Sequence, residues 1–130
     1  MWGRKKQPPI RTLVGEGTLV HGELRFADGL RIDGEVQGDV VAMSPRSLLV
    51  ISEQARVAGK VKAGHIILCG TVEGPIVCDE LLEVQPRARI VGDVRYHLLE
   101  LQPGASIDGE LRPLKAEEKP ALKLAASNIA

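Results

Sequence analysis

Apolar and polar residues alternate strictly between Leu30 and Val40, in the segment LRIDGEVQGDV. An extended strand places alternate side chains on opposite faces, so this segment can bury one face and expose the other. A helix with 3.6 residues per turn would scatter both sets around its circumference, which excludes a helix here. The positions on the inward side are Leu30, Ile32, Gly34, Val36, Gly38 and Val40.

The ending of this segment, an apolar–x–Gly–x–apolar pattern, occurs six times along the chain. Its glycines span 87 residues in five steps, so one unit repeats about every 17 residues. From the second unit onward, a further apolar pair precedes each ending, as Leu30 and Ile32 do here. The six endings are Val20-Gly22-Leu24, Val36-Gly38-Val40, Val57-Gly59-Val61, Val72-Gly74-Ile76, Ile90-Gly92-Val94 and Ile107-Gly109-Leu111.

Each unit therefore offers three short inward-facing runs separated by corners, and no unit could bury its inner face alone. Stacked units could, with each turn hydrogen-bonding to the turns above and below it. The repeat predicts an all-β fold: a single-stranded parallel β-helix, roughly triangular in section, of about six turns. At a strand spacing of ~4.8 Å, six turns make a rod of roughly 29 Å. The inward glycines are expected to let the coil pinch at a corner. Glu53, at an inward register, is expected at a corner with its carboxylate outside.

The repeat divides the chain into one domain and two flanks. We expect the β-helix over residues 15–112, with disordered tails at 1–14 and 113–130. Pro8 and Pro9 interrupt any ladder at the start, and Pro113 and Pro120 do so at the end.

Composition adds a thin aliphatic core and an acidic body. The chain has one Trp, one Tyr and one Phe, so the core must consist of Val, Ile, Leu and Ala. Residues 12–111 carry 15 acidic and 9 basic side chains, a net charge of −6. Phosphate contacts need a basic surface, which argues against nucleic acid as a partner. No apolar run approaches the ~20 residues of a membrane-spanning helix.

The chain resembles the bactofilins. The resemblance covers about residues 15–111 and rests on IDGEVQGDV at 32–40, LQPGASIDGEL at 101–111 and the repeated glycine endings. It implies a right-handed β-helix that polymerises without nucleotide into non-polar filaments, on the cytoplasmic face of the bacterial inner membrane. It also implies a scaffold that recruits peptidoglycan-remodelling enzymes and influences cell shape. Many members have an aromatic contact residue in the last turn; here an aliphatic one, Ile107 or Leu111, must replace it.

Polymerisation also follows from the geometry of a solenoid. Each end leaves an open row of backbone N–H and C=O groups, and no convincing cap is visible in the sequence at either end. End-to-end stacking would bury the apolar faces of the first and last turns. Contacts of like ends are isologous and give a filament without polarity, but one chain does not reveal which ends meet. The expected interface residues are Val20, Leu24, Phe26, Leu99, Leu101, Ile107 and Leu111.

The N-terminal tail is a candidate for contact with the membrane lipid surface through Trp2, Arg4, Lys5 and Lys6. Trp favours the headgroup level, and each cation near an anionic leaflet contributes about 1 kcal/mol. The plain alternative is a basic, solubilising start of the chain.

The sequence indicates no catalytic, cofactor or metal site. His65 and His97 could stack near one corner, but nothing near them suggests ligand spacing, and outward histidines are the simpler interpretation. Cys78 takes an inward register and is expected in the core, whereas Cys69 is expected as a surface thiol. No catalytic triad order, phosphate-binding loop or dinucleotide fingerprint is present. The acids that flank the glycines are expected on the outer face, solvated or facing a basic partner.

Two other functions remain as alternatives to a cytoskeletal scaffold. A non-filamentous β-solenoid binding module would use the same fold as a monomer or small oligomer. A hexapeptide-repeat acyltransferase would need an aliphatic residue every six positions, whereas the spacing here is four between Ile32, Val36 and Val40.

Overall fold

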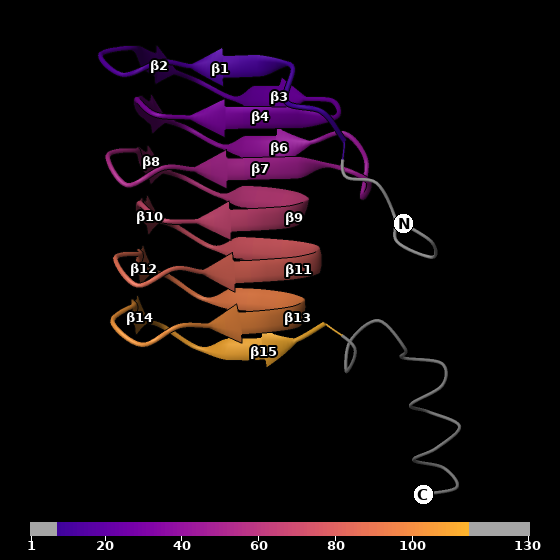
Figure 1. The fold of residues 1–130 in the computed structure, drawn as a ribbon, viewed down its shortest axis with the longest axis vertical. Coiled ribbons are helices and arrows are strands. Elements are labelled where there is room, and N and C mark those ends of the chain that lie inside the picture. The colour runs from indigo at the N-terminus through magenta and orange to yellow at the C-terminus, as the bar shows by residue number, and fades with distance from the viewer. Residues whose placement is uncertain (1–7, 115–130) are drawn as a thin grey trace, which may run out of the picture.

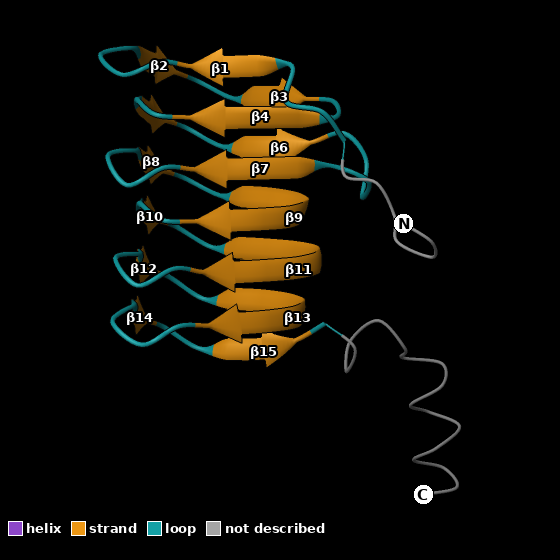
Figure 2. Cartoon of the chain, viewed as in Figure 1, coloured by secondary structure: helices purple, strands orange, loops and turns teal. Residues whose placement is uncertain are grey.

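The computed structural model describes residues 8–114, which form fifteen β-strands and no helix (Figures 1 and 2). The tails predicted to be disordered fall largely outside these residues, at 1–7 and 115–130. Within the described part, the strands stack in chain order from one end of a column to the other (Figure 1).

The column has six turns with three strand segments in each. The first two turns are β1 (Thr12–Val14), β2 (Leu19–His21), β3 (Leu24–Phe26), β4 (Gly29–Ile32), β5 (Glu35–Gln37) and β6 (Val40–Ala42). The later turns comprise β7 (Leu48–Ile51), β8 (Arg56–Ala58), β9 (Val61–Leu68), β10 (Thr71–Glu73), β11 (Ile76–Val84), β12 (Arg89–Val91), β13 (Val94–Leu101), β14 (Ser106–Asp108) and β15 (Leu111–Pro113). The long strands β9, β11 and β13 each end one turn and begin the next.

Every strand pairs in parallel with its counterpart one turn away. One sheet runs β1-β4-β7-β9-β11-β13-β15, joined by β3 and β6, and the other runs β14-β12-β10-β8-β5-β2. Equivalent residues of the repeat therefore lie directly above one another, as Leu30 does with Leu49 and Leu49 with Ile66. This confirms the predicted all-β solenoid of about six turns. The ladder includes Thr12, which pairs with Leu30, so it begins before residue 15.

The inward positions form one continuous aliphatic core. Leu30, Ile32, Val36 and Val40 are all 0% exposed, as the alternating pattern of their segment predicted. Cys78 is also fully buried and packs within the same cluster, in register with Ala63. Burial in a core of this width needs the next turn on each side, because no single turn encloses its own side chains.

The repeated glycines stack on one another at a corner of the coil. The φ angle is +156° at Gly59 and +151° at Gly74, a conformation that side-chain-bearing residues rarely adopt. A Cβ atom on Gly74 would lie 2.6 Å from the carbonyl carbon of Gly59 in the preceding turn. The glycines are therefore the residues that let the backbones of successive turns meet, which confirms the pinched corner.

The exceptional residue of the repeat, Glu53, lies where it was expected. Its side chain is 57% exposed, and its carboxylate approaches the guanidinium group of Arg87 in a later turn at 3.8 Å.

Candidate polymerisation interfaces

Each end of the column has strands that pair on one side only within residues 8–114. At the N-terminal end these are β1, β2 and β3, whose partners are β4, β5 and β6. At the C-terminal end β14 and β15 pair only with β12 and β13 (Figure 1). Open strand edges of this kind are templates for pairing with another chain.

The C-terminal end exposes side chains that are fully buried one turn earlier. Leu101 is 49% exposed, whereas its partner Val84 is 0% exposed. Leu111 is 39% exposed, whereas its partner Val94 is 0% exposed. Leu99 and Ile107 are half-buried and pack against the core. The last turn thus presents an aliphatic surface of inward residues with nothing stacked below it among the described residues.

At the N-terminal end, the three predicted interface residues are all at least half-buried. Val20 and Leu24 are half-buried, but Phe26 is only 4% exposed. The sequence predicted that Phe26, at an inward register, would be exposed at the open end of the first turn, but the ring is buried. Phe26 stacks on Ala42, whose small side chain leaves room for the ring inside the core.

Two exposed leucines at this end are absent from the interface predicted from the sequence. Leu13 is 59% exposed in β1 and Leu19 is 53% exposed in β2. Both occupy outward positions, whereas the predicted interface residues were chosen for their inward register. An apolar residue at an outward position of the first turn is the signal that could have identified them.

Two of the acids that follow the glycines accept hydrogen bonds from backbone amides at the corners. The N–H of Glu110 donates to Asp93 Oδ1 at 3.0 Å, and the N–H of Lys60 donates to Asp39 Oδ1 at 2.9 Å. These carboxylates therefore stabilise the corners between turns, in addition to being solvated.

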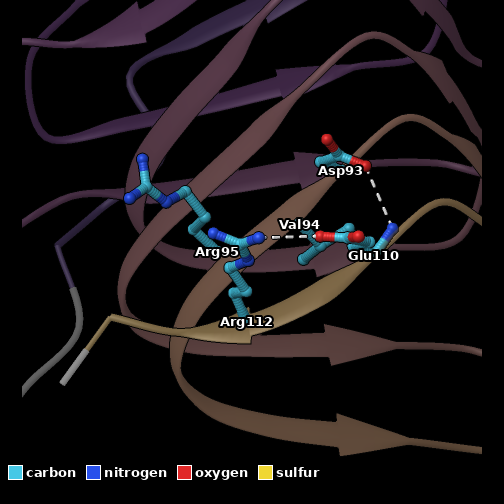
Figure 3. A pocket seen from close by; sticks show the side chains of 5 residues that line it. All are labelled: Asp93, Val94, Arg95, Glu110 and Arg112. Atoms are coloured by element: carbon cyan, nitrogen blue, oxygen red, sulfur yellow. Dashed lines mark hydrogen bonds and ion pairs between the residues drawn. The ribbon is translucent and has the colours of Figure 1, made fainter. Parts of the chain in front are cut away.

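An open pocket of about 210 Å³ lies beside Asp93 and Glu110, between the last two turns (Figure 3). Its lining residues are Asp93, Val94, Arg95, Glu110 and Arg112. The Nη2 atom of Arg112 lies 3.0 Å from Glu110 Oε1. Two carboxylates balance two guanidinium groups, so the pocket offers no charge preference to a ligand.

The histidines do not stack on one another. Leu81 pairs with His65 on one side and with Leu98 on the other, so His97 lies one residue out of that register. The suggestion that His65 and His97 could meet at one corner is therefore wrong. The Nε2 atom of His65 instead lies 2.7 Å from Glu83 Oε2.

The two cysteines differ in burial and in acidity. Burial raises the pKa of the Cys78 thiol to about 12, and its Sγ donates to the carbonyl oxygen of Gly64 at 3.2 Å. Cys78 is therefore a core residue, as expected. Cys69 is half-buried, and desolvation raises the pKa of its thiol as well. Among residues 8–114, no three His, Cys, Asp or Glu side chains gather as metal ligands would.

The predicted membrane-contact residues Trp2, Arg4, Lys5 and Lys6 lie outside the described part of the chain. Within residues 8–114, no helix has the length and apolar character needed to cross a bilayer.

Comparison with known proteins agrees with this geometry. The family described as Bactofilin, polymer-forming cytoskeletal, matches residues 12–112. The chain is 26% identical over 84 residues to Bactofilin BacO of Myxococcus xanthus, an alignment that covers 65% of this chain and 64% of that protein. It is 30% identical over 84 residues to Bactofilin BacP of the same organism, covering 65% of this chain and 34% of that protein. The chain thus spans less than two thirds of the length of either relative, and no solved structure matches it significantly. Since the family match spans the whole solenoid, the chain belongs to the bactofilin family of polymer-forming cytoskeletal proteins.

Proposed function

We propose that this protein assembles end to end, without nucleotide, into non-polar filaments whose contacts are the terminal turns of the solenoid. The observation that carries the proposal is the surface of the last turn. Leu101 and Leu111 are 49% and 39% exposed, although the residues stacked on them are completely buried. A second subunit would supply the missing turn.

The energetics require both the side chains and the backbone. Full burial of a Leu or Ile side chain is worth ~1.5–3 kcal/mol. About half of that is still to be gained by Leu99, Leu101, Ile107 and Leu111, which are already partly buried. A symmetric contact, with four such residues from each subunit, therefore gains roughly 6–12 kcal/mol. The translational and rotational freedom lost on association costs ~4–15 kcal/mol, which is comparable with this gain. The hydrogen bonds of the open strand edges are therefore needed to make the contact stable.

Like ends are the better match for such a contact. Inward aliphatic residues are exposed at the C-terminal end, whereas Phe26 is buried at the N-terminal end, so the two ends offer different surfaces. An isologous contact between two C-terminal ends buries aliphatic against aliphatic surface. Alternation of this contact with one between N-terminal ends produces a filament without polarity.

The filament is proposed to lie on the cytoplasmic face of the bacterial inner membrane. Trp2, Arg4, Lys5 and Lys6 supply an aromatic anchor and three cations to each subunit. A weak tail repeated along a filament gives strong avidity. There the filament would act as a non-enzymatic scaffold that recruits peptidoglycan-remodelling enzymes and influences cell shape.

The assembly test replaces Ile107 by Arg and compares filament lengths by negative-stain electron microscopy. We expect short oligomers, because the charge would be desolvated in the contact between last turns. Val91→Arg is the matched control, since Val91 is 50% exposed at an outward position of the neighbouring strand. Unchanged filament lengths in Ile107→Arg would contradict the terminal contact. A parent protein that is monodisperse and small by light scattering would favour a binding module instead.

The membrane test removes residues 1–7 and measures co-sedimentation with phosphatidylglycerol vesicles. We expect loss of co-sedimentation with normal filament assembly, and little binding of the parent to neutral phosphatidylcholine vesicles. Persistent binding of the shortened chain to the anionic vesicles would contradict the tether.

A further inference from the structure

The outward residues on one face of the solenoid form a column with an unusual order. We call this column the side face; its residues stack one per turn through the register of β1, β4, β7, β9, β11 and β13. They are Leu13, Arg31, Val50, Ile67, Glu83 and Glu100. Their immediate chain neighbours within these strands are inward core residues over most of the face, so the side face is the outer surface of this sheet.

From the second turn to the fifth, the side face changes from a basic residue through an apolar centre to an acidic residue, with apolar Leu13 in the first turn and acidic Glu100 in the sixth. Arg31 lies in the second turn, whereas the charge of Arg11 nearby is balanced by Asp28 at 2.9 Å. Val50 and Ile67 occupy the third and fourth turns and are partly exposed. The fifth and sixth turns carry the carboxylates Glu83 and Glu100.

The sequence Arg31, Val50, Ile67, Glu83 along the face is complementary to its own reverse, because each charge then meets the opposite charge and each apolar residue meets an apolar one. We propose that the side face binds the side face of a second copy of this chain in antiparallel orientation. The two-fold axis would run parallel to the strands, midway between β7 and β9. That operation sets Val50 against Ile67 and Arg31 against Glu83, and repeats each contact by symmetry. Leu13 and Glu100, which would lie opposite each other at the outer turns, add no attraction to the contact.

Existing ion pairs leave room for the new ones. The Nε atom of Arg31 lies 2.9 Å from Asp33 Oδ1, yet the Arg31 side chain is 50% exposed. The carboxylate of Glu83, which lies 2.7 Å from His65 Nε2, is on a side chain that is 25% exposed. A guanidinium group carries five donors and a carboxylate about four acceptor sites, so both can take a further partner.

The same operation fails on the other two faces. On the face formed by β3, β6 and the later strands in register with them, it would set Lys62 against Val77 and Val41 against Arg95, so each charge would meet an apolar side chain. On the sheet of β2 to β14, the central pair is Arg56 and Thr71, both polar. Arg56 is already held by Glu73 at 2.7 Å. Among the three faces of the described solenoid, only the side face has two apolar residues at its centre with opposite charges on either side of them, in the second and fifth turns.

A second copy fits this surface better than an anionic membrane or a charged peptide. A membrane or peptide presents one sign of charge. An anionic one would be repelled by Glu83 and Glu100, and a cationic one by Arg31. The side contact lies at the middle turns, whereas the proposed filament contact lies at the terminal turns. Both can form together, and the inference then deepens the proposed function: two filaments would associate side by side, with many weak contacts acting together.

The first test is cross-linking that does not depend on filament formation. Val50→Cys and Ile67→Cys are made as separate proteins, each with Cys69→Ser, mixed in equal amounts and treated with a short bis-maleimide. We expect more cross-linked dimer in the mixture than with either protein alone, because the two-fold axis offsets like residues by a further strand spacing of ~4.8 Å. Ala58→Cys, on the outer face of β8, is the matched control and should give little dimer. Equal yields in all samples would overturn the proposal.

The second test reverses charges and measures filament width by electron microscopy. Arg31→Glu should weaken the side contact roughly tenfold, because two symmetric attractive pairs become repulsive, and paired filaments should become single. Adding Glu83→Arg to Arg31→Glu should restore pairing. Arg56→Glu is the control, because Arg56 is 53% exposed and also makes one ion pair.

The two proposals fail in distinguishable ways. Cross-linked dimers without filaments would support the side contact and refute end-to-end assembly. If the filaments of Arg31→Glu keep the parent's width, the side contact alone would be overturned. The same holds if filaments form but Val50→Cys and Ile67→Cys give no cross-links. Loss of vesicle binding in Arg31→Glu with pairing intact would assign the side face to the membrane and likewise overturn the proposal.

Discussion

The glycine corner gives the sharpest prediction about stability, the replacement of Gly74 by Ala. The φ angle of +151° at Gly74 costs a residue with a side chain ~1–3 kcal/mol. The new Cβ atom would also lie 2.6 Å from the carbonyl carbon of Gly59 and 3.2 Å from its Cα atom, distances at which one of the two turns must move.

Such a movement acts on backbone hydrogen bonds on both sides of the glycine. The N–H of Gly59 donates to the carbonyl oxygen of Glu73 and the N–H of Val61 to that of Pro75, each at 2.9 Å. Weakening one or two bonds, worth about 0.5–1.5 kcal/mol each, adds to the cost of the φ angle. We expect Gly74→Ala to lower the free energy of unfolding by about 3–5 kcal/mol.

Two other glycines separate these contributions. Gly22 has a φ of +113°, but a Cβ atom there would have no neighbour within 4 Å, so Gly22→Ala should show the backbone cost alone. Gly15 has neither a positive φ nor a close neighbour, so Gly15→Ala should be nearly neutral. The assay is unfolding in guanidinium followed by circular dichroism at one protein concentration, because association shifts apparent stability. Equal costs for Gly74→Ala and Gly22→Ala would refute the argument from close backbone contact.

Two further predictions concern buried side chains. Ser47 is 2% exposed, donates through Oγ to the carbonyl oxygen of Ser44 at 2.8 Å and accepts from the N–H of Gly64 at 2.9 Å. Ser47→Ala should therefore cost ~1–3 kcal/mol in the same unfolding assay, whereas Ser106→Ala at an exposed position should cost little. The pKa of Cys78 rises from 9.0 to about 12 on folding, so the folded state holds a proton that the unfolded state loses in this range. Stability should fall above pH 9 by up to about 1.4 kcal/mol per pH unit, and Cys78→Ala should reduce that slope; an unchanged slope would contradict the assignment.

The local sequence pattern was sufficient to predict the fold because every turn repeats the same short alternation of apolar and polar residues. Leu30, Ile32, Val36 and Val40 alternate with polar residues, and strand geometry then requires them on one face. The recurrence of the Gly endings required stacking, since no turn can enclose its own core. The structure confirms both expectations, and it also confirms Cys78 inside and Glu53 outside.

The candidate interfaces could be predicted only in part, because they depend on which neighbours are missing. Leu101 and Leu111 have the same inward register as buried Val84 and Val94, and only their place in the last turn exposes them. Phe26 has the same kind of terminal place in the first turn but is buried, because the space beside Ala42 accommodates its ring. Leu13 and Leu19 escaped notice because alternation alone assigns them to solvent.

By itself, the amino-acid sequence determined the strand period, the length of the repeat and the side of each strand that faces the core, since these depend on residues close together in the chain. The alignment of the repeats also predicted which residues lie above one another, as Leu30, Leu49 and Ile66 do. Only the tertiary structure decided which side chains meet between the turns. It decided that His65 meets Glu83 and not His97, and that Phe26 is buried although it lies in the first turn. The physical reason is that backbone hydrogen bonds between turns select the partners, and those bonds join residues far apart in the chain.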